Sequence, residues 1–248
     1  MINVAVLGAK GRMGAEVVKA VEAQDGMTLI AALDLGDSLE QLIGSGTHVV
    51  VDFTTPDAVI DNLKFVINNG MNVVVGTTGF DEKKIAIVDG ICKQNPEVGV
   101  LIAPNFAIGA VLMMEFAAKA AHYFESAEII ELHHPDKVDA PSGTAARTAQ
   151  LMSDARKAAG LSAMPDATKT SLDGARGSRV GDIAVHSVRI LGLVAHQEVI
   201  LGGVGQTLTI RHDSLDRAGF MPGVLLGIRK VLTHPGLTHG LDKFMERD

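Results

Sequence analysis

Residues 2–14 are INVAVLGAKGRMG, a short apolar run with β-branched residues followed by a loop rich in glycine. The run predicts a buried strand, and the periodicity after Met13 predicts a helix. Gly8, Gly11 and Gly14 let the chain turn tightly and approach a pyrophosphate, which N–H groups at the helix N-terminus can bind. The spacing G-x-x-G-x-x-G is less common than G-x-G-x-x-G, so the strand–loop–helix context carries most of the evidence for a nucleotide site.

The same alternation of short apolar runs and helical patterns continues to residue 105. This alternation is typical of right-handed βαβ units, so it predicts a parallel sheet. The predicted strands are 3–7, 28–33, 48–53, 72–75 and 99–103, and the predicted helices are 13–23, 56–69 and 81–93.

The pattern changes after Pro104. The remaining chain predicts, in order, a helix at 108–123, a strand at 128–133, a helix at 144–159, a loop over 161–181, antiparallel strands at 183–190, 197–201 and 206–212, and a helix over 214–232 that Pro222 and Gly223 break or kink. The predicted fold class is α/β, with a Rossmann-like parallel-sheet nucleotide domain and a second α+β domain on a mixed or antiparallel sheet. The nucleotide domain takes residues 1–105 plus 214–248, and the second domain takes 106–213.

An acidic residue stands where a dinucleotide site needs one. Asp34 ends the second predicted strand, about 20 residues after Gly14, so its carboxylate can accept hydrogen bonds from the adenosine ribose. This carboxylate should repel the 2′-phosphate of NADPH, yet Lys10 and Arg12 in the glycine loop can neutralise that phosphate. The choice between NADH and NADPH therefore stays open.

Two further loops follow the fourth and fifth predicted strands. Open parallel sheets bind ligands at the carboxyl ends of their strands, so these loops are predicted to contact the nicotinamide half of the cofactor. The candidate cofactor-binding residues are Gly8, Ala9, Lys10, Gly11, Arg12, Met13, Gly14, Asp34, Gly76, Thr77, Thr78, Ala103, Pro104, Asn105 and Phe106.

Residues 131–144, ELHHPDKVDAPSGT, combine two imidazoles, one ammonium group and a Ser-Gly-Thr turn. Imidazole exchanges protons near neutral pH, an ammonium group pairs with a carboxylate or donates a proton, and such a turn presents N–H groups to an anion. No metal site is predicted, because His133 and His134 should point to opposite faces of a strand and no other ligand stands at a usual spacing. Ser142 lies outside any G-x-S-x-G elbow, so proton transfer and carboxylate binding are the predicted roles.

Taken together, these segments resemble the dihydrodipicolinate reductase family, also called 4-hydroxy-tetrahydrodipicolinate reductases. The resemblance extends from end to end and is carried by residues 6–14, 52–54, 76–79, 103–106 and 131–144, the last of which is specific to the family. It implies NADH- or NADPH-dependent reduction of 4-hydroxy-tetrahydrodipicolinate to tetrahydrodipicolinate with loss of water, in the diaminopimelate pathway of lysine biosynthesis.

The resemblance also implies residue roles. His133 is the expected proton donor or acceptor and Lys137 the expected proton donor, and which of them makes the decisive transfer stays open because such close groups titrate together. His134, Ser142 and the Gly143-Thr144 backbone are expected to bind the dicarboxylate substrate. The second domain is expected to build a homotetramer through its sheet.

Composition limits the partners and the alternatives. A net charge of −7 disfavours nucleic acid, no apolar stretch is long enough to span a membrane, and the N-terminus lacks a signal-peptide layout, so the expected location is the cytoplasm. One alternative is another nicotinamide enzyme, such as a semialdehyde or amino-acid dehydrogenase. Semialdehyde dehydrogenases need a cysteine nucleophile, and Cys92, the only cysteine, lies in a predicted apolar helix. A second alternative is a nucleotide-sensing regulator, which would need neither the histidine pair nor Lys137.

Overall fold

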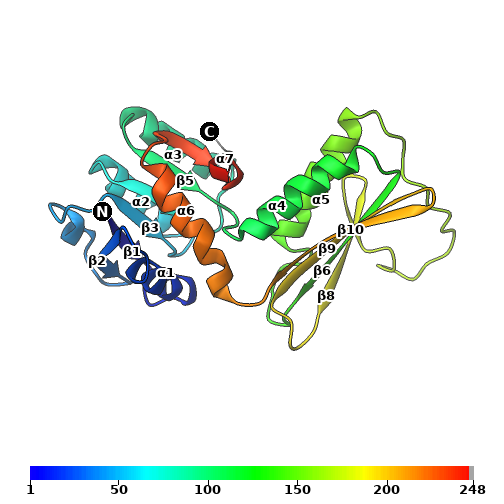
Figure 1. Ribbon diagram of the computed structural model, residues 1–248, viewed down its shortest axis with the longest axis horizontal. Coiled ribbons are helices and arrows are strands. Elements are labelled where there is room, and N and C mark those ends of the chain that lie inside the picture. Colours follow the sequence, from blue (N-terminus) through cyan, green and yellow to red (C-terminus); the bar gives the residue numbers. More distant parts are fainter. Residues whose placement is uncertain (246–248) are drawn as a thin grey trace. The chain divides into compact units, whose positions relative to one another are not determined.

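The computed structural model describes residues 1–245, which fold into two compact units (Figure 1). Unit 1 contains Met1–Ile108 and returns at Arg217, and unit 2 contains Gly109–Asp216. The division predicted from the sequence, after residues 105 and 213, lies a few residues from these bounds. Each unit has its own sheet.

Unit 1 is built on a six-stranded parallel sheet with the order β11-β5-β4-β3-β1-β2. This order confirms the predicted Rossmann-like fold, because the chain leaves β1 to opposite sides for β2 and β3. The strands are β1 (Ile2–Leu7), β2 (Met27–Leu33), β3 (Val49–Asp52), β4 (Asn72–Val75), β5 (Gly99–Ile102) and β11 (Gly236–His239).

Helices cover both faces of this sheet because successive strand residues point to opposite sides. Val73, Val75 and Val100 belong to the core cluster beneath α2 (Val59–Asn68) and α3 (Glu82–Gln94). The intervening Val74 and Leu101 lie on the opposite face, against Gly227 of α6. The other helical segments of unit 1 are α1 (Arg12–Glu22), η1 (Leu39–Leu42), η2 (Arg217–Phe220), α6 (Met221–Val231) and α7 (Asp242–Met245).

The end of the chain differs from the prediction. Ser214, the predicted start of the last helix, is instead the last residue of β10 (Gln206–Ser214), and α6 begins at Met221. Pro222 lies in the first turn of α6, where a missing N–H costs nothing, so it marks the start of the helix rather than a kink within it. The sequence also gave no indication of β11, which is four residues long and pairs with β5 at the edge of the sheet.

Unit 2 has a five-stranded mixed sheet with the order β10-β9-β6-β8-β7. Its strands are β6 (Ser126–His133), β7 (Ser178–Val180), β8 (Ile183–Arg189), β9 (Ala195–Gly203) and β10, and its helices are α4 (Ile108–Ala121) and α5 (Gly143–Ala158). Buried apolar residues of α4 and α5, including Ala117, Ala149 and Met152, form one core with Ile129 of β6.

Two details of unit 2 correct the prediction. β8 pairs parallel to β6, not antiparallel, because α5 carries the chain back to the starting edge before β8 begins. β7 lies within the predicted 161–181 loop and forms a hairpin with β8. The parallel pairing places His133 opposite Arg189 and Glu131 opposite Ser187, which brings distant residues to the end of β6.

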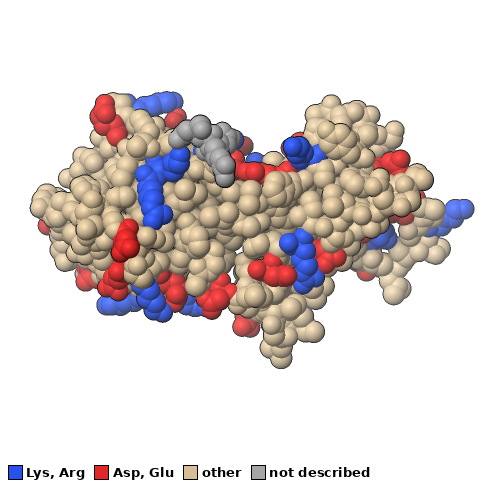
Figure 2. Space-filling view, in the orientation of Figure 1, with Lys and Arg blue, Asp and Glu red and all other residues tan. Residues whose placement is uncertain are grey.

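The surface carries charges of both signs. On the face drawn in Figure 2, lysine and arginine side chains are interspersed with aspartate and glutamate. Among residues 1–245, no helix has both the length and the apolar character needed to cross a membrane.

Candidate active site

The glycine loop of unit 1 joins β1 to α1 with little space for side chains. Gly8 has φ +77°, and a Cβ at this position would lie 2.5 Å from the carbonyl oxygen of Phe53. A Cβ on Gly14 would lie 2.0 Å from the carbonyl oxygen of Gly8. The N-cap of α1 is Gly11, and no side chain caps the helix, so its first-turn N–H groups face the loop without a side-chain competitor. This arrangement fits a pyrophosphate.

Asp34 stands beside this loop at the end of β2. Its Oδ2 accepts the backbone N–H of Lys10 at 2.6 Å, and its Oδ1 accepts the N–H of Leu35 at 2.8 Å. These two hydrogen bonds lower the pKa of Asp34, so the carboxylate is charged at neutral pH. Each oxygen keeps a second lone pair, which can accept a ribose hydroxyl. Lys10 and Arg12 are exposed in the same loop.

Asp52 organises the neighbouring strand ends, a role that was not predicted from the sequence. Its fully buried carboxylate accepts the N–H and the hydroxyl of Thr54 at 3.0 and 2.7 Å, the Thr77 hydroxyl at 2.6 Å and the Asn62 amide at 2.9 Å. It thereby ties the loop after β4 to the end of β3. The sequence contained one sign of this role, an acidic residue at the end of a run of valines. A carboxylate buried in that place needs several hydrogen-bond donors around it.

Phe53 and Phe106 form an apolar wall at the same edge of the sheet. Their ring centroids lie 5.8 Å apart, and a Cβ on Gly76 would lie 2.1 Å from Cε1 of Phe53. The loops that follow β1, β3, β4 and β5 are adjacent because these strands are neighbours. All the predicted cofactor-binding residues thus lie in unit 1 around the carboxyl ends of its strands, together with the end of β2 at Asp34.

In unit 2, His133 is the last residue of β6 and its side chain is 13% exposed. Its Nδ1 lies 2.6 Å from Oε2 of Glu131, two residues earlier on the same face of the strand. Burial lowers the pKa of His133, and the charges of Lys137 and Arg189 lower it further, while Glu131 acts in the opposite direction. His133 is therefore neutral at pH 7.

Glu131 is fully buried and is charged nonetheless. Burial would raise the pKa of Glu131, but hydrogen bonds from Arg189, Ser187 and His133 lower it below its ordinary value. Arg189 binds both carboxylate oxygens, at 2.8 and 2.7 Å, and the backbone N–H of Ser142 donates to Oε1 at 3.1 Å. Glu131 thus joins β6, β8 and the start of α5.

Lys137 lies in the turn that follows β6. Its N–H donates to the carbonyl oxygen of His134 at 3.3 Å, and its Nζ lies 2.6 Å from Oδ1 of Asp139. The hydrogen bond from Lys137 is the main cause that lowers the pKa of Asp139, and the backbone N–H of Gly143 contributes to it. A carboxylate is therefore held between an ammonium group and the N-terminus of a helix.

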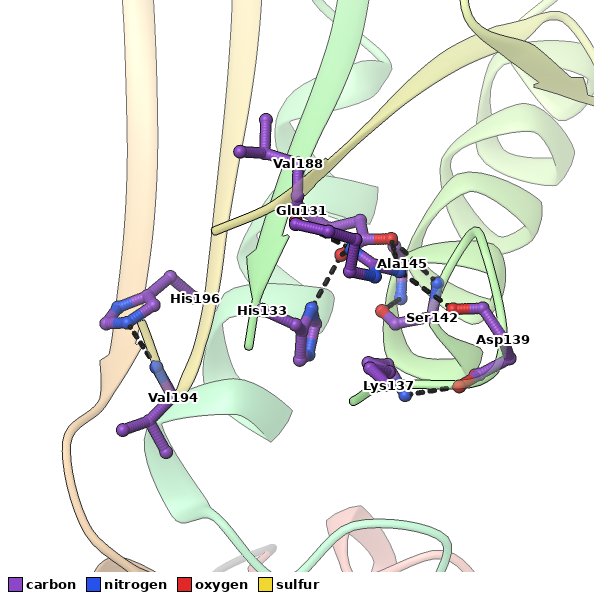
Figure 3. Close-up of polar contacts among 10 residues, drawn as sticks. Glu131, His133, Lys137, Asp139, Ser142, Ala145, Val188, Val194 and His196 are labelled. Atoms are coloured by element: carbon purple, nitrogen blue, oxygen red, sulfur yellow. Dashed lines mark hydrogen bonds and ion pairs between the residues drawn. The ribbon is translucent and has the colours of Figure 1, made fainter. Parts of the chain in front are cut away.

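The helix in question is α5, which begins at Gly143 rather than at Thr144 as predicted. Ser142 is its N-cap and accepts the N–H of Ala145 at 3.2 Å. Figure 3 shows Glu131, His133, Lys137, Asp139 and Ser142 grouped beside the start of this helix.

The structure therefore brings together His133, Lys137, Ser142 and Gly143, with Thr144 in the next position of α5 and His134 directly after β6. Glu131, Asp139 and Arg189 also belong to this group, although no role was predicted for them from the sequence. Glu131 and Asp139 could have been found from their i, i+2 spacing to His133 and Lys137. Arg189 could not, because 58 residues separate it from Glu131.

His196 lies apart from this group, and its Nε2 accepts the N–H of Val194 at 3.2 Å. No group of three potential ligands that could hold a metal ion occurs within residues 1–245.

Comparison with known proteins covers both units. The family models of the N-terminal and C-terminal parts of dihydrodipicolinate reductase match residues 2–106 and 109–245. The chain is 61% identical to a 4-hydroxy-tetrahydrodipicolinate reductase of Mycolicibacterium smegmatis, with 99% of each chain covered. It is 59% identical to the reductase of Streptomyces avermitilis, with 99% of this chain and 98% of the relative covered. Among solved structures, the dipicolinate-bound dihydrodipicolinate reductase from Paenisporosarcina sp. TG-14 superimposes with a TM-score of 0.87 at 39% identity, with 98% and 99% covered.

Proposed function

Because the chain belongs to the dihydrodipicolinate reductase family, we propose that its 131–144 segment handles the substrate and that the loops of unit 1 hold the nucleotide. The protein is an NAD(P)H-dependent oxidoreductase that reduces 4-hydroxy-tetrahydrodipicolinate to tetrahydrodipicolinate with loss of water. This reaction belongs to the diaminopimelate pathway of lysine biosynthesis. The assignment of individual residues is the proposal that follows.

The substrate is a dicarboxylate, as is the dipicolinate held by the Paenisporosarcina relative. Lys137 Nζ and the Gly143 N–H together hold the carboxylate of Asp139, which supports the proposal that the same groups accept a substrate carboxylate. The N-terminus of α5 adds a partial positive charge, and no acidic residue lies in its first turn. The other proposed substrate-binding residues are His134, Ser142 and Thr144. Ser142 can cap α5 through a lone pair while its hydroxyl proton remains a donor.

The nicotinamide, when bound, supplies a hydride to a ring carbon of the cyclic imine. The two electrons that arrive must be matched by one proton held at that place. Lys137 is the proposed donor of this proton from Nζ, and His133 lies near enough for the charge of Lys137 to lower its pKa. His133, neutral at pH 7, is the proposed partner that accepts or returns a proton at Nε2. Asp34 and the Gly8–Gly14 loop are proposed to orient the adenosine and pyrophosphate parts.

The proposed assembly is a homotetramer joined through the sheet of unit 2. Most residues of its edge strand β10 are exposed, and Leu208 among them is 39% exposed, so an apolar side chain is available on that strand. The proposed location is the cytoplasm. Light scattering after size-exclusion chromatography measures the mass, and a monomer at micromolar concentration would contradict the assembly.

Reduced-cofactor oxidation at the nicotinamide absorption band tests the activity. Pyruvate and aspartate semialdehyde are condensed in situ, and NADH and NADPH are added in separate runs. Oxidation that depends on the condensation product is expected, and the two rates rank the cofactors. If a protein that still binds nucleotide oxidises neither cofactor, a related dehydrogenase or a nucleotide sensor becomes the better assignment. Titration with dipicolinate, the molecule held by the Paenisporosarcina relative, measures the dicarboxylate site separately.

A further inference from the structure

The environment of His133 restricts which of its ring nitrogens carries a proton. Nδ1 lies 2.6 Å from Oε2 of Glu131, a distance that requires a proton between the two atoms. Either Glu131 or His133 must supply that proton, and the surroundings of Glu131 decide which.

Glu131 accepts hydrogen bonds from a positively charged side chain and from a backbone N–H. Arg189 donates to both oxygens, and the N–H of Ser142 donates to Oε1. Arg189 always carries its charge, so an ionised Glu131 makes the pair neutral overall, whereas a protonated Glu131 would leave that charge uncompensated beside a buried carboxyl group. An ionised carboxylate accepts and cannot donate, and the proton therefore belongs to Nδ1 of His133.

Arg189 holds this arrangement in place from a second strand. It lies directly opposite His133 in the parallel pairing of β6 with β8, and its NH2 also donates to the carbonyl oxygen of Asp139 at 2.7 Å. The same guanidinium thus fixes the carboxylate under His133 and the loop that carries Lys137. Displacing Arg189 would loosen both groups at once.

We propose that Glu131, held by Arg189, is a positioning residue that keeps the proton of His133 on Nδ1 and leaves the lone pair of Nε2 toward the substrate. The inference rests on the proposed role of His133 in the reaction. In this state His133 accepts at Nε2 and offers no proton there. The same logic applies wherever a buried carboxylate orients a catalytic histidine.

The tautomer can be read directly in the unmodified protein. The ¹⁵N shifts of labelled histidine distinguish a protonated from an unprotonated ring nitrogen, and the His133→Asn spectrum identifies the signals of His133. We expect the Nδ1–H form at pH 7.5. The Nε2–H form at that pH would overturn the inference, and this measurement needs no substitution at Glu131.

Glu131→Gln tests the consequence for the reaction. The amide can still accept from Nδ1 but no longer selects the tautomer or compensates Arg189, so kcat should fall by roughly 10²-fold while nucleotide affinity stays unchanged. The charged groups facing His133 are Glu131 on its own strand, Arg189 on β8 and Lys137 in the loop. Since Glu131 raises the pKa of His133, its removal should move the acid limb of the kcat/KM profile to lower pH. A merely structural role would lower stability and leave that limb in place.

The chain provides a matched control on the same strand. Glu128 of β6 also pairs with a histidine and an arginine, namely His186 at 2.7 Å and Arg176, but it lies outside the 131–144 segment. Glu128→Gln should leave kcat and the acid limb unchanged. Arg189→Lys is the second variant if Glu131→Gln does not fold. It keeps the charge but loses the bidentate hydrogen bonding to Glu131, so it should lower kcat and shift the same acid limb.

The outcomes separate this inference from the assignment of His133 itself. Full activity of His133→Asn would refute the catalytic role of His133. The Nδ1–H tautomer would still be observed in the unmodified protein. An inactive His133→Asn protein together with a Glu131→Gln protein of wild-type kcat and pH profile would refute the positioning role and keep the proposed function.

Discussion

At the scale of single residues, Lys137 holds the one ammonium group of the 131–144 segment. Lys137→Met keeps the length of the side chain and removes its charge. We expect kcat to fall by about 10²-fold or more, because a positioned proton donor contributes this much. The nucleotide should bind with unchanged affinity, since its proposed loops lie in unit 1. Fluorescence titration with NADPH, alongside the rate assay, measures both quantities.

Lys157→Met is the control for Lys137→Met. Lys157 is an exposed residue in the last turn of α5, in the same unit as Lys137. Its loss should leave both quantities at the wild-type level. Loss of nucleotide binding in Lys137→Met would show that the two binding roles are assigned to the wrong units.

Cys92 distinguishes the reductase from a cysteine-dependent dehydrogenase. It is buried in α3, and burial raises the pKa of its thiol to about 11. At pH 8 the thiolate is therefore scarce and shielded, and we expect a thiol reagent to leave the folded enzyme unmodified and active. The same reagent should modify one thiol per chain in urea. Rapid modification of the folded protein with loss of activity would favour a nucleophilic cysteine.

At the scale of secondary-structure elements, the start of α5 serves both stability and binding. Ser142→Ala removes the oxygen that accepts the N–H of Ala145, which should lower the free energy of unfolding by about 1 kcal/mol. The substitution also removes the proposed hydroxyl donor to the substrate, so KM for the dicarboxylate should rise. Urea unfolding and steady-state kinetics measure the two effects.

Asp81→Ala is the matched control for Ser142→Ala. Asp81 caps α3 in unit 1 by accepting the N–H of Lys84 at 2.8 Å. Its loss should lower stability by a similar amount and leave KM for the dicarboxylate unchanged. An unchanged KM in Ser142→Ala would limit Ser142 to capping.

At the scale of the whole molecule, two partly buried histidines make stability depend on pH. Burial lowers the pKa of both His133 and His212 below 6.5, the value they regain on unfolding. Below pH 6.5 the unfolded chain therefore binds protons that the folded chain does not, so stability should fall as the pH is lowered from 6.5 to 5. The lowered pKa values of Glu131 and Asp139 have their effect only below pH 4.5.

Urea midpoints at pH 7.5 and 5.5 measure this dependence. His133→Asn should flatten it, because one of the two contributing histidines is gone. His122 is exposed on the surface, so His122→Asn should leave the pH dependence of the midpoint unchanged. A wild-type midpoint that is the same at both values would contradict the lowered pKa values.

The sequence by itself determined most of the parallel sheet and the identity of the family. Strands buried on both faces appear as short apolar runs. The glycine loop and the 131–144 segment are each a continuous stretch of sequence. All of these features can therefore be recognised without knowing the fold. Local patterns failed where pairing decides the outcome. β11 is too short to stand out, and the parallel pairing of β8 with β6 depends on the path of α5.

The tertiary structure alone decided how the predicted residues are supported. Arg189 meets Glu131 only because β6 and β8 are neighbours, and Asp52 meets Thr77 only because β3 and β4 are. Buried carboxylates need several donors at fixed distances, and a chain that folds back on itself supplies them from positions far apart in sequence. The motif thus predicts His133 and Lys137 as candidate catalytic residues. The neighbouring charges and hydrogen bonds that set their protonation and position come from the fold.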